Sequence, residues 1–189
     1  MRRLHDVGLE RKDQRVAVVE RPGRFHPGSV LRKQAIDQGG IPGPRVYPSG
    51  ALISQTAGHG DFTAAYENTA TLGGARSRYE DIGAFLIANG PAEVAAAVRQ
   101  QCRRGASQVK ISLGGGVISD SDPIDTLQYT SEEIRAAVQA ATDWGTYVCA
   151  HVYTVNGIRR AIEGGVRSIE HGHIADEDTV RRVRKLHEL

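Results

Sequence analysis

The chain has 189 residues, enough for one ordinary domain with a buried core or for part of a larger one. Apolar residues make up 40% and charged residues 24%, a composition typical of globular proteins rather than of disordered or membrane-spanning chains. The formal net charge of +2 is near balance, and the basic residues of 181–185 suit a solvated helix face, so no nucleic-acid partner is expected.

Targeting signals and disulfides are not expected either. Residues 1–15 are charged and lack the apolar core of a signal peptide, and no run approaches the ~18 apolar residues of a transmembrane helix. Cys102 and Cys149 belong to no metal-binding or redox motif, which suits a reducing compartment. We therefore expect a cytoplasmic protein without a membrane partner.

The first ninety residues have the weakest pattern. Residues 1–30 are a divergent N-terminal segment, in which VAVVE at 16–20 fits a strand. Residues 29–40 predict a helix, and residues 44–50 predict a strand that runs into a loop. The segment 51–89 is glycine-rich and weakly periodic, which is typical of functional loops, although a poorly marked helix fits equally well.

From residue 91 onward, helices and strands alternate regularly. Residues 91–105 predict a helix that opens with proline, ends at a glycine and keeps an apolar stripe on one face. Residues 107–113 predict a strand, because apolar and polar residues alternate there. Further helices are predicted over 130–145, 154–165 and 176–189, and further strands over 146–152 and 166–171.

Capping signals support two of these helices. Thr130 and Glu133 form a capping box, and Asp176 is expected to cap the last helix. Alternation of this kind predicts a parallel sheet with helices outside, in one domain that we place over residues 31–189.

Three residues occupy equivalent places in this pattern. Lys110, His151 and His171 each lie near the C-terminal end of a predicted strand, separated by 41 and then 20 residues. Taken singly, each would more often be a satisfied polar residue or the partner of a carboxylate. In βα barrels, however, these strand ends converge on one mouth where catalytic groups collect, so the three together indicate a functional site.

At these residues the sequence resembles the metal-dependent amidohydrolase superfamily, in its imidazolonepropionase-like and Xaa-Pro-dipeptidase-like branch. The matching runs include GASQVKISLGGGVISDSDP, YTSEEIRAAVQAATDWGTYVCAHVYT and GIRRAIEGGVRSIEHGHIADED, and the resemblance covers most of residues 31–180. It implies an α/β fold, a (β/α)8 TIM-type barrel, of which this chain would supply roughly strands two to six.

The resemblance also implies a hydrolase of C–N bonds in amides or cyclic amides. In this branch the lysine matched by Lys110 is carboxylated and bridges two divalent metal ions, usually zinc, and the histidines matched by His151 and His171 bind one of them. Imidazole nitrogen suits zinc, whereas a protonated lysine has no lone pair until it becomes a carbamate. A metal-bound hydroxide then attacks the polarised carbonyl of a small amide or dipeptide-like substrate.

Two parts of the family's site are not identifiable. The only His-x-His is His171-Gly172-His173, in the sixth-strand position rather than the first, and no strand-end aspartate follows it. LHDVG at residues 4–8 resembles the second strand, with His5 where arginine is usual. A full barrel takes about 250 residues. We therefore expect a fragment of the full enzyme, with exposed sheet edges and with self-association into a homo-oligomer left open.

Other groups are candidates for contacting the substrate. His59, in AGHGDF, is expected in a loop over the same mouth, where it either contacts substrate or is simply exposed. Tyr153, two residues beyond His151, either binds a substrate carbonyl or carboxylate or packs. His173 is expected beyond the strand, in a loop.

Alternation along the strands predicts the direction of the side chains. With Lys110 and His151 facing inward, Val109 and Ala150 face the helices. An inward His171 would turn the preceding glutamate outward, a conflict that a bulge or an end-of-strand twist would resolve.

Two alternatives compete with the metal-dependent hydrolase. In one, LGGGVISDSD cradles a phosphate in a βα-barrel enzyme of another class, although no P-loop lysine follows the glycines. In the other, the chain is a catalytically inactive barrel remnant that acts as a binding module.

Overall fold

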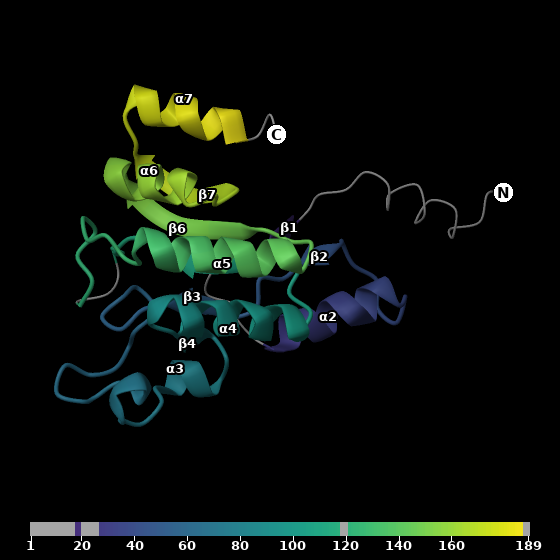
Figure 1. The fold of residues 1–189 in the computed structure, drawn as a ribbon. Coiled ribbons are helices and arrows are strands. Elements are labelled where there is room, and N and C mark those ends of the chain that lie inside the picture. Colours follow the sequence, from purple (N-terminus) through teal and green to yellow (C-terminus); the bar gives the residue numbers. More distant parts are fainter. Residues whose placement is uncertain (1–17, 20–26, 118–120, 187–189) are drawn as a thin grey trace.

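A parallel five-stranded sheet forms the centre of the protein, in a computed structural model that describes residues 18–19, 27–117 and 121–186 (Figure 1). The strand order is β4-β3-β5-β6-β7. The strands are β3 (Leu52–Ser54), β4 (Phe85–Ile87), β5 (Val109–Ser112), β6 (Val148–Thr154) and β7 (Ser168–Ile174). A separate parallel pair consists of β1 (Val18–Val19) and β2 (Val46–Tyr47).

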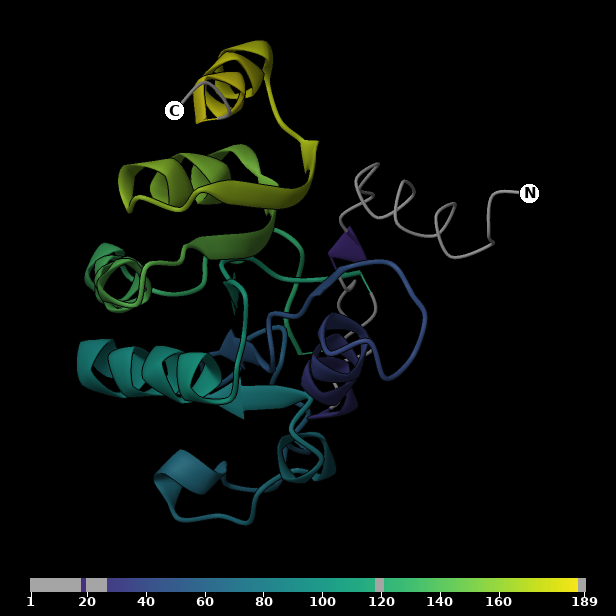
Figure 2. The same ribbon diagram turned by 90° about the vertical axis from the view of Figure 1, so that its right-hand side faces the viewer.

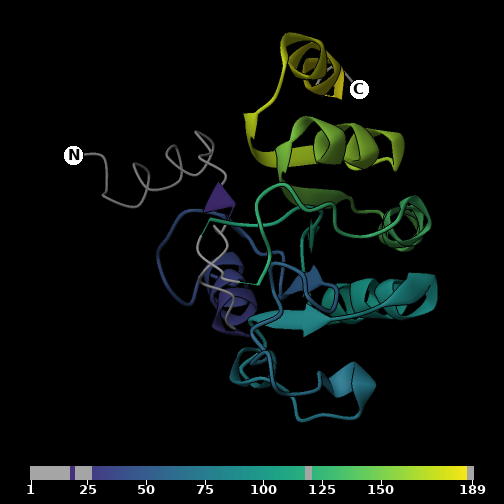
Figure 3. The same cartoon turned by 90° about the vertical axis from the view of Figure 1, so that its left-hand side faces the viewer.

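The helices alternate with these strands along the chain. They are α2 (Pro27–Asp37), α3 (Arg78–Asp81), α4 (Gly90–Arg103), α5 (Ser131–Asp143), α6 (Val155–Glu163) and α7 (Glu177–Leu186), with a short 3-10 turn, η1, at Ala70–Leu72. Helices α4, α5 and α6 line one face of the sheet, whereas α2 and several connecting loops lie on the other side (Figures 2 and 3). Within the described residues, no helix is long and apolar enough to cross a membrane.

The capping signals of the sequence form as predicted. Thr130 Oγ1 accepts a hydrogen bond from the Glu133 backbone, and the Glu133 side chain accepts one from Thr130 in return. Asp176 Oδ1 accepts a hydrogen bond from the backbone N–H of Thr179, 2.7 Å away, at the start of α7. Each cap satisfies N–H groups that the first turn of a helix leaves unpaired.

The hydrophobic core lies between the sheet and its helices. The helix-facing strand residues Val109, Ile111, Val148 and Ala150 are almost fully buried there, against Val94 and Val98 of α4 and Ile134 and Ala137 of α5. This confirms the predicted direction of the strand side chains. The sheet with helices on one face is a partial (β/α)8 barrel, as predicted.

The segment 51–89, for which a functional loop and a poorly marked helix were both expected, consists of short elements joined by loops: two strands, the 3-10 turn η1 and the four-residue helix α3. Strands β3 and β4 pair with each other in parallel, and α4 begins at Gly90, directly after the segment. The strands escaped prediction because each has only three residues, and because all three residues of β3 are buried, so no apolar–polar alternation marks it.

Two of the strands that carry the candidate residues, β6 and β7, extend further towards the C-terminus than predicted. Strand β6 continues from His151 to Thr154, and β7 continues from His171 to Ile174. His151 and His171 therefore lie within their strands rather than closing them. Of the strand predicted at 16–20, two residues form β1 and the others lie outside the described residues, as does His5.

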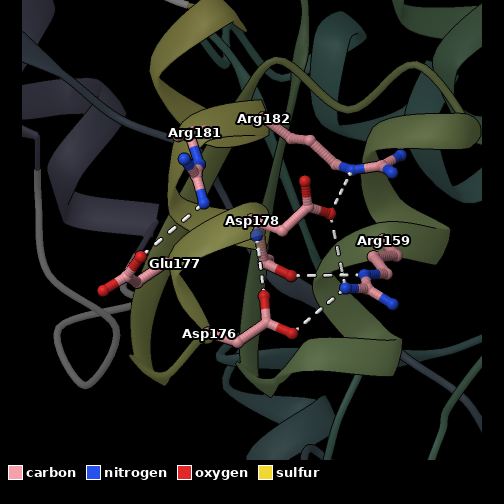
Figure 4. A network of polar contacts seen from close by, with 7 residues as sticks. Arg159, Asp176, Glu177, Asp178, Arg181 and Arg182 are labelled. Atoms are coloured by element: carbon pink, nitrogen blue, oxygen red, sulfur yellow. Dashed lines mark hydrogen bonds and ion pairs between the residues drawn. The ribbon is translucent and has the colours of Figure 1, made fainter.

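A network of charged side chains joins α6 to α7 (Figure 4). Arg159 Nη2 lies 3.1 Å from Asp176 and 3.4 Å from Asp178, and Arg182 Nε lies 2.9 Å from the same Asp178 oxygen. Arg181 pairs instead with Glu177 inside α7. The network fixes the last helix beside α6 at one end of the sheet.

Candidate metal centre

The candidate residues come from adjacent strands and lie on the sheet face opposite the main helices. In the strand register, Ser112 pairs with His151, and His151 pairs with Glu170. Lys110 is only 2% exposed and follows Val109, which faces the helices. Successive residues of a strand point to opposite faces, so Lys110 is directed away from the helices.

Lys110 and Glu170 form an ion pair between β5 and β7. Regular alternation with an inward His171 would place this glutamate outward, beneath the helices, and an irregularity of the expected kind resolves that conflict. The irregularity lies in β7: its pairing with β6 shifts register between Val152 and Thr154, and His171 has a φ of +78°. The left-handed backbone at His171 breaks the period of two, so both Glu170 and His171 reach the site.

Three aromatic rings gather around His151, those of His59, Tyr153 and His171. The ring of His59 stacks on it, with centroids 4.0 Å apart and planes 10° apart. The ring of His171 lies 4.7 Å away, edge to face, and the ring of Tyr153 lies 5.1 Å away. Tyr153 also stacks on His171 at 4.9 Å and lies 5.9 Å from His173. Residues from a loop and two strands thus converge on one point, and His59 lies in a loop over the strand residues.

The site keeps its central histidines uncharged. Burial lowers the pKa of His151 to about 3, and nearby His59 contributes in the same direction. Burial also lowers the pKa of His171, and the charge of Lys110 adds to this effect. Neutral imidazole has a lone pair that a metal ion can bind, whereas imidazolium has none.

A backbone carbonyl determines which nitrogen of His151 carries that lone pair. His151 Nε2 lies 3.0 Å from the carbonyl oxygen of Gly115, and since a carbonyl only accepts, Nε2 carries the proton. Nδ1 therefore remains as the potential metal ligand. Metal-binding histidines usually donate their other ring N–H to an acceptor of this kind.

The residues present fit part of a divalent metal site. In the described part of the chain, no three His, Cys, Asp or Glu side chains are grouped so that they could hold a metal ion. His151 and His171 supply two neutral imidazoles, and among the described residues a third donor would have to be of another kind. The buried Lys110 would provide it as a carbamate, whose oxygens can bind a cation.

Three features of the site were not singled out from the sequence. Glu170 pairs with Lys110, Asp122 lies 2.9 Å from Nδ1 of His59, and Gln128 Oε1 accepts a hydrogen bond from the His59 backbone at 3.0 Å. Asp122 and Gln128 belong to a loop without periodicity, and no sequence signal shows which loop residues fold inward. His173 was expected in a loop but lies within β7, where it is exposed.

The glycine run does not support a phosphate cradle. The carbonyl of Gly115 is bonded by His151, and the N–H of Gly116 donates to the carbonyl of Asp122 at 3.2 Å. An anion site needs free backbone N–H groups, preferably at the start of a helix. The next helix in the described residues, α5, begins only at Ser131.

Comparison with known proteins shows which family shares this arrangement. The chain is 44% identical to ochratoxinase from Aspergillus niger over 149 residues. The aligned region covers 77% of this chain and 31% of that protein. The fold superimposes on a crystal structure of a prolidase complexed with N-methylphosphonate-L-proline, with a TM-score of 0.76 and 37% identity over 86% of this chain and 39% of the other.

A third similar protein is an Xaa-Pro dipeptidase solved with methionine bound in its active site. The TM-score is 0.72 and the identity 34%, over 87% of this chain and 39% of the other. The chain therefore spans only 31–39% of the length of these three proteins. The family model of the amidohydrolases matches residues 22–185. This match and the 44% identity confirm the resemblance seen in the sequence, and the chain belongs to the amidohydrolase family.

Proposed function

We propose that this chain supplies the Lys110, His151 and His171 side of a divalent metal centre that hydrolyses amide C–N bonds. The observation that carries the proposal is the convergence of two neutral imidazoles and a buried lysine on adjacent parallel strands. Zinc is the metal that suits imidazole nitrogens best among the common hydrolytic ions. When bound, such an ion would polarise a carbonyl and lower the pKa of water.

Lys110 would bind metal only after carboxylation. In the unmodified chain, the Lys110 ammonium is paired with the Glu170 carboxylate. The ammonium first loses a proton to solvent, the neutral amine attacks carbon dioxide and forms a new N–C bond, and the nitrogen then loses a second proton to solvent. Carboxylation replaces that positive charge with a negative one, so the ion pair must separate. Metal binding and loss of the Lys110–Glu170 contact are then coupled.

His59 and Tyr153 are placed to contact a substrate beside this centre. The His59 ring centroid lies 4.0 Å from that of His151, and the Tyr153 centroid lies 4.9 Å from that of His171. Both side chains carry polar atoms that can bond a carbonyl or a carboxylate. Prolidase, Xaa-Pro dipeptidase and ochratoxinase are the names of the similar proteins. We propose small acyl-amino acids or dipeptides as the substrate class, with His59 and Tyr153 as binding residues.

Metal analysis of the purified chain tests the proposal. After incubation with zinc and bicarbonate and removal of free metal, we expect bound zinc in the wild-type chain and at least a tenfold lower content in Lys110→Ala and His151→Ala. His173→Ala is the matched control, because this exposed histidine is not a proposed ligand, and it should retain the metal. A chain without zinc in all four forms, or with equal zinc in all four, would reject the site.

A further inference from the structure

One loop holds two of the imidazoles at the site. This 114–129 loop connects β5 to α5, and its two described arms are residues 114–117 and 121–129. The arms are joined near their base, where Gly114 pairs with Leu127 in an isolated antiparallel bridge. The loop lies against His59 and His151 but supplies neither of them.

The first arm fixes His151 and the second arm fixes His59. The Gly115 carbonyl oxygen accepts a hydrogen bond from His151 Nε2, with 3.0 Å between the nitrogen and the oxygen. Asp122 Oδ2 lies 2.9 Å from His59 Nδ1, and the Asp122 side chain is fully buried. Since a carboxylate accepts and does not donate, His59 Nδ1 carries the hydrogen. The two rings that receive these bonds stack on each other at 4.0 Å.

The same loop also fixes the backbone that carries His59. Gln128 is 1% exposed, and its Oε1 accepts the hydrogen of the His59 backbone N–H at 3.0 Å. His59 is therefore held both at its main chain and at its ring.

Close packing explains the glycines of the first arm. A Cβ atom on Gly115 would lie 2.0 Å from the Pro123 carbonyl oxygen of the second arm. On Gly116 it would lie 2.1 Å from Cε1 of the His59 ring. Both distances are far below van der Waals contact, so the loop approaches itself and the ring as closely as it does only without side chains there. Gly115 and Gly116 thus allow the loop to pack closely against itself and against the His59 ring, a role that involves no phosphate.

We propose that the two described arms, residues 114–117 and 121–129, act as a positioning element that sets opposite tautomers on the two stacked imidazoles, with Asp122 as the residue that fixes His59. His151 is held as the Nε2–H form, which leaves its Nδ1 lone pair for a metal. His59 is held as the Nδ1–H form, which leaves its Nε2 lone pair, and in the described residues this nitrogen has no hydrogen-bond partner. The unprotonated Nε2 of His59 then lies beside the proposed metal centre, where it can accept a hydrogen bond from a bound substrate or water.

Imidazole tautomers can be measured directly in the purified 189-residue chain. Two-bond ¹H–¹⁵N correlation spectra of ¹⁵N-labelled protein, at about pH 8 where free imidazole is neutral, distinguish protonated from unprotonated ring nitrogens. In the wild-type chain we expect the Nδ1–H form for His59 and the Nε2–H form for His151. Resonances are assigned with His59→Gln and His151→Gln.

Variants of the loop separate positioning from general stability. Asp122→Ala should shift His59 to the Nε2–H form that predominates in free histidine, while His151 keeps its form. Asp122→Asn retains an acceptor oxygen and should restore the Nδ1–H form. Asp125→Ala, an exposed aspartate of the same loop, is the matched control and should change neither ring. Amide spectra check that each variant is folded.

Two results would overturn the proposal. One is a wild-type chain in which His59 is in the Nε2–H form, a result that does not depend on the folding of any variant. The other is a folded Asp122→Ala chain in which the His59 tautomer is unchanged. This inference deepens the proposed function, because it concerns the same site, but its test requires no metal and no activity. Failure to bind zinc would reject the metal centre and leave the tautomer result standing.

Discussion

At the scale of single residues, the site depends on a lysine ammonium that is almost completely removed from water. Lys110 is 2% exposed, whereas Glu170, its partner, retains 22% exposure in its side chain. Removing one member of such a pair leaves an uncompensated charge, which costs more than the pair itself contributes. The pair therefore stabilises the unmodified chain chiefly because the buried ammonium group of Lys110 is not solvated by water and needs the carboxylate to compensate its charge.

Substitution of Glu170 should therefore destabilise the fold. We expect Glu170→Gln to lower the free energy of unfolding by about 1–3 kcal/mol, since Lys110 stays buried and charged without a carboxylate. Urea denaturation in a metal-free buffer measures this. Glu163→Gln, an exposed glutamate at the end of α6, should change it by less than about 0.5 kcal/mol. Equal losses in the two variants would contradict the role of the pair.

The neutral state of His151 predicts a dependence of stability on pH. Its pKa is about 3 in the folded chain and about 6.5 when unfolded, so the unfolded state binds the proton more readily. The contribution is fully present above pH 6.5 and is lost as the pH falls towards 3. Between pH 6.5 and 5 the loss is about 2 kcal/mol, at about 1.4 kcal/mol per pH unit.

A variant without a titrating group isolates this effect. His151→Gln cannot gain the proton, so its free energy of unfolding should fall less steeply than that of the wild type between pH 7.5 and 5. Urea denaturation of both chains at these two pH values, in the presence of a chelator, gives the difference. The same fall in both chains would show that His151 is protonated without penalty.

At the scale of elements, the helices are held by local sequence signals and the short strands are not. The capping box of α5 and the Asp176 cap of α7 involve residues three apart, so they are visible in the sequence. Strands β3 and β4 are formed by pairing with each other and with β5. Each of these strands has only three residues, too few for a sequence pattern that would identify the pairing partners, so the sequence alone does not reveal them.

The attachment of α7 gives a prediction at this scale. Arg159 of α6 reaches both Asp176 and Asp178, whereas Arg181 pairs only within α7. Arg159→Ala should increase amide hydrogen exchange in α7 roughly fivefold, because exposed ion pairs each contribute little and two are lost together. Arg181→Ala should leave the exchange of α7 nearly unchanged. Equal effects of the two substitutions would assign the attachment of α7 to other contacts.

The candidate site shows the same division between local and distant information. Lys110, His151 and His171 were identifiable because strand and helix lengths fix their separations along the chain. The roles of Asp122 and Glu170 depend on how a loop folds back and on a left-handed residue in β7. Neither property follows from periodicity, since one is set by long-range packing and the other breaks the strand pattern.

At the scale of the whole molecule, the five-stranded sheet is an open arc with two outer strands, β4 and β7. Unpaired strand edges are templates for pairing with another chain. We therefore expect concentration-dependent self-association of the isolated chain in sedimentation velocity. Ile174→Lys, which places a charge on β7 at a residue that is 50% exposed, should weaken it. A wild-type chain that stays monomeric over the whole concentration range would contradict this expectation.

The central claim is that Lys110, His151 and His171 together bind a divalent metal. A crystal structure of the chain grown with zinc and bicarbonate, with anomalous data at the zinc edge, tests it most directly. We predict an anomalous peak about 2.0–2.1 Å from His151 Nδ1 and from a nitrogen of His171, with a carboxyl group added to Lys110 Nζ and the contact with Glu170 lost. Lys110 still paired with Glu170, with zinc absent or bound elsewhere, would contradict the claim.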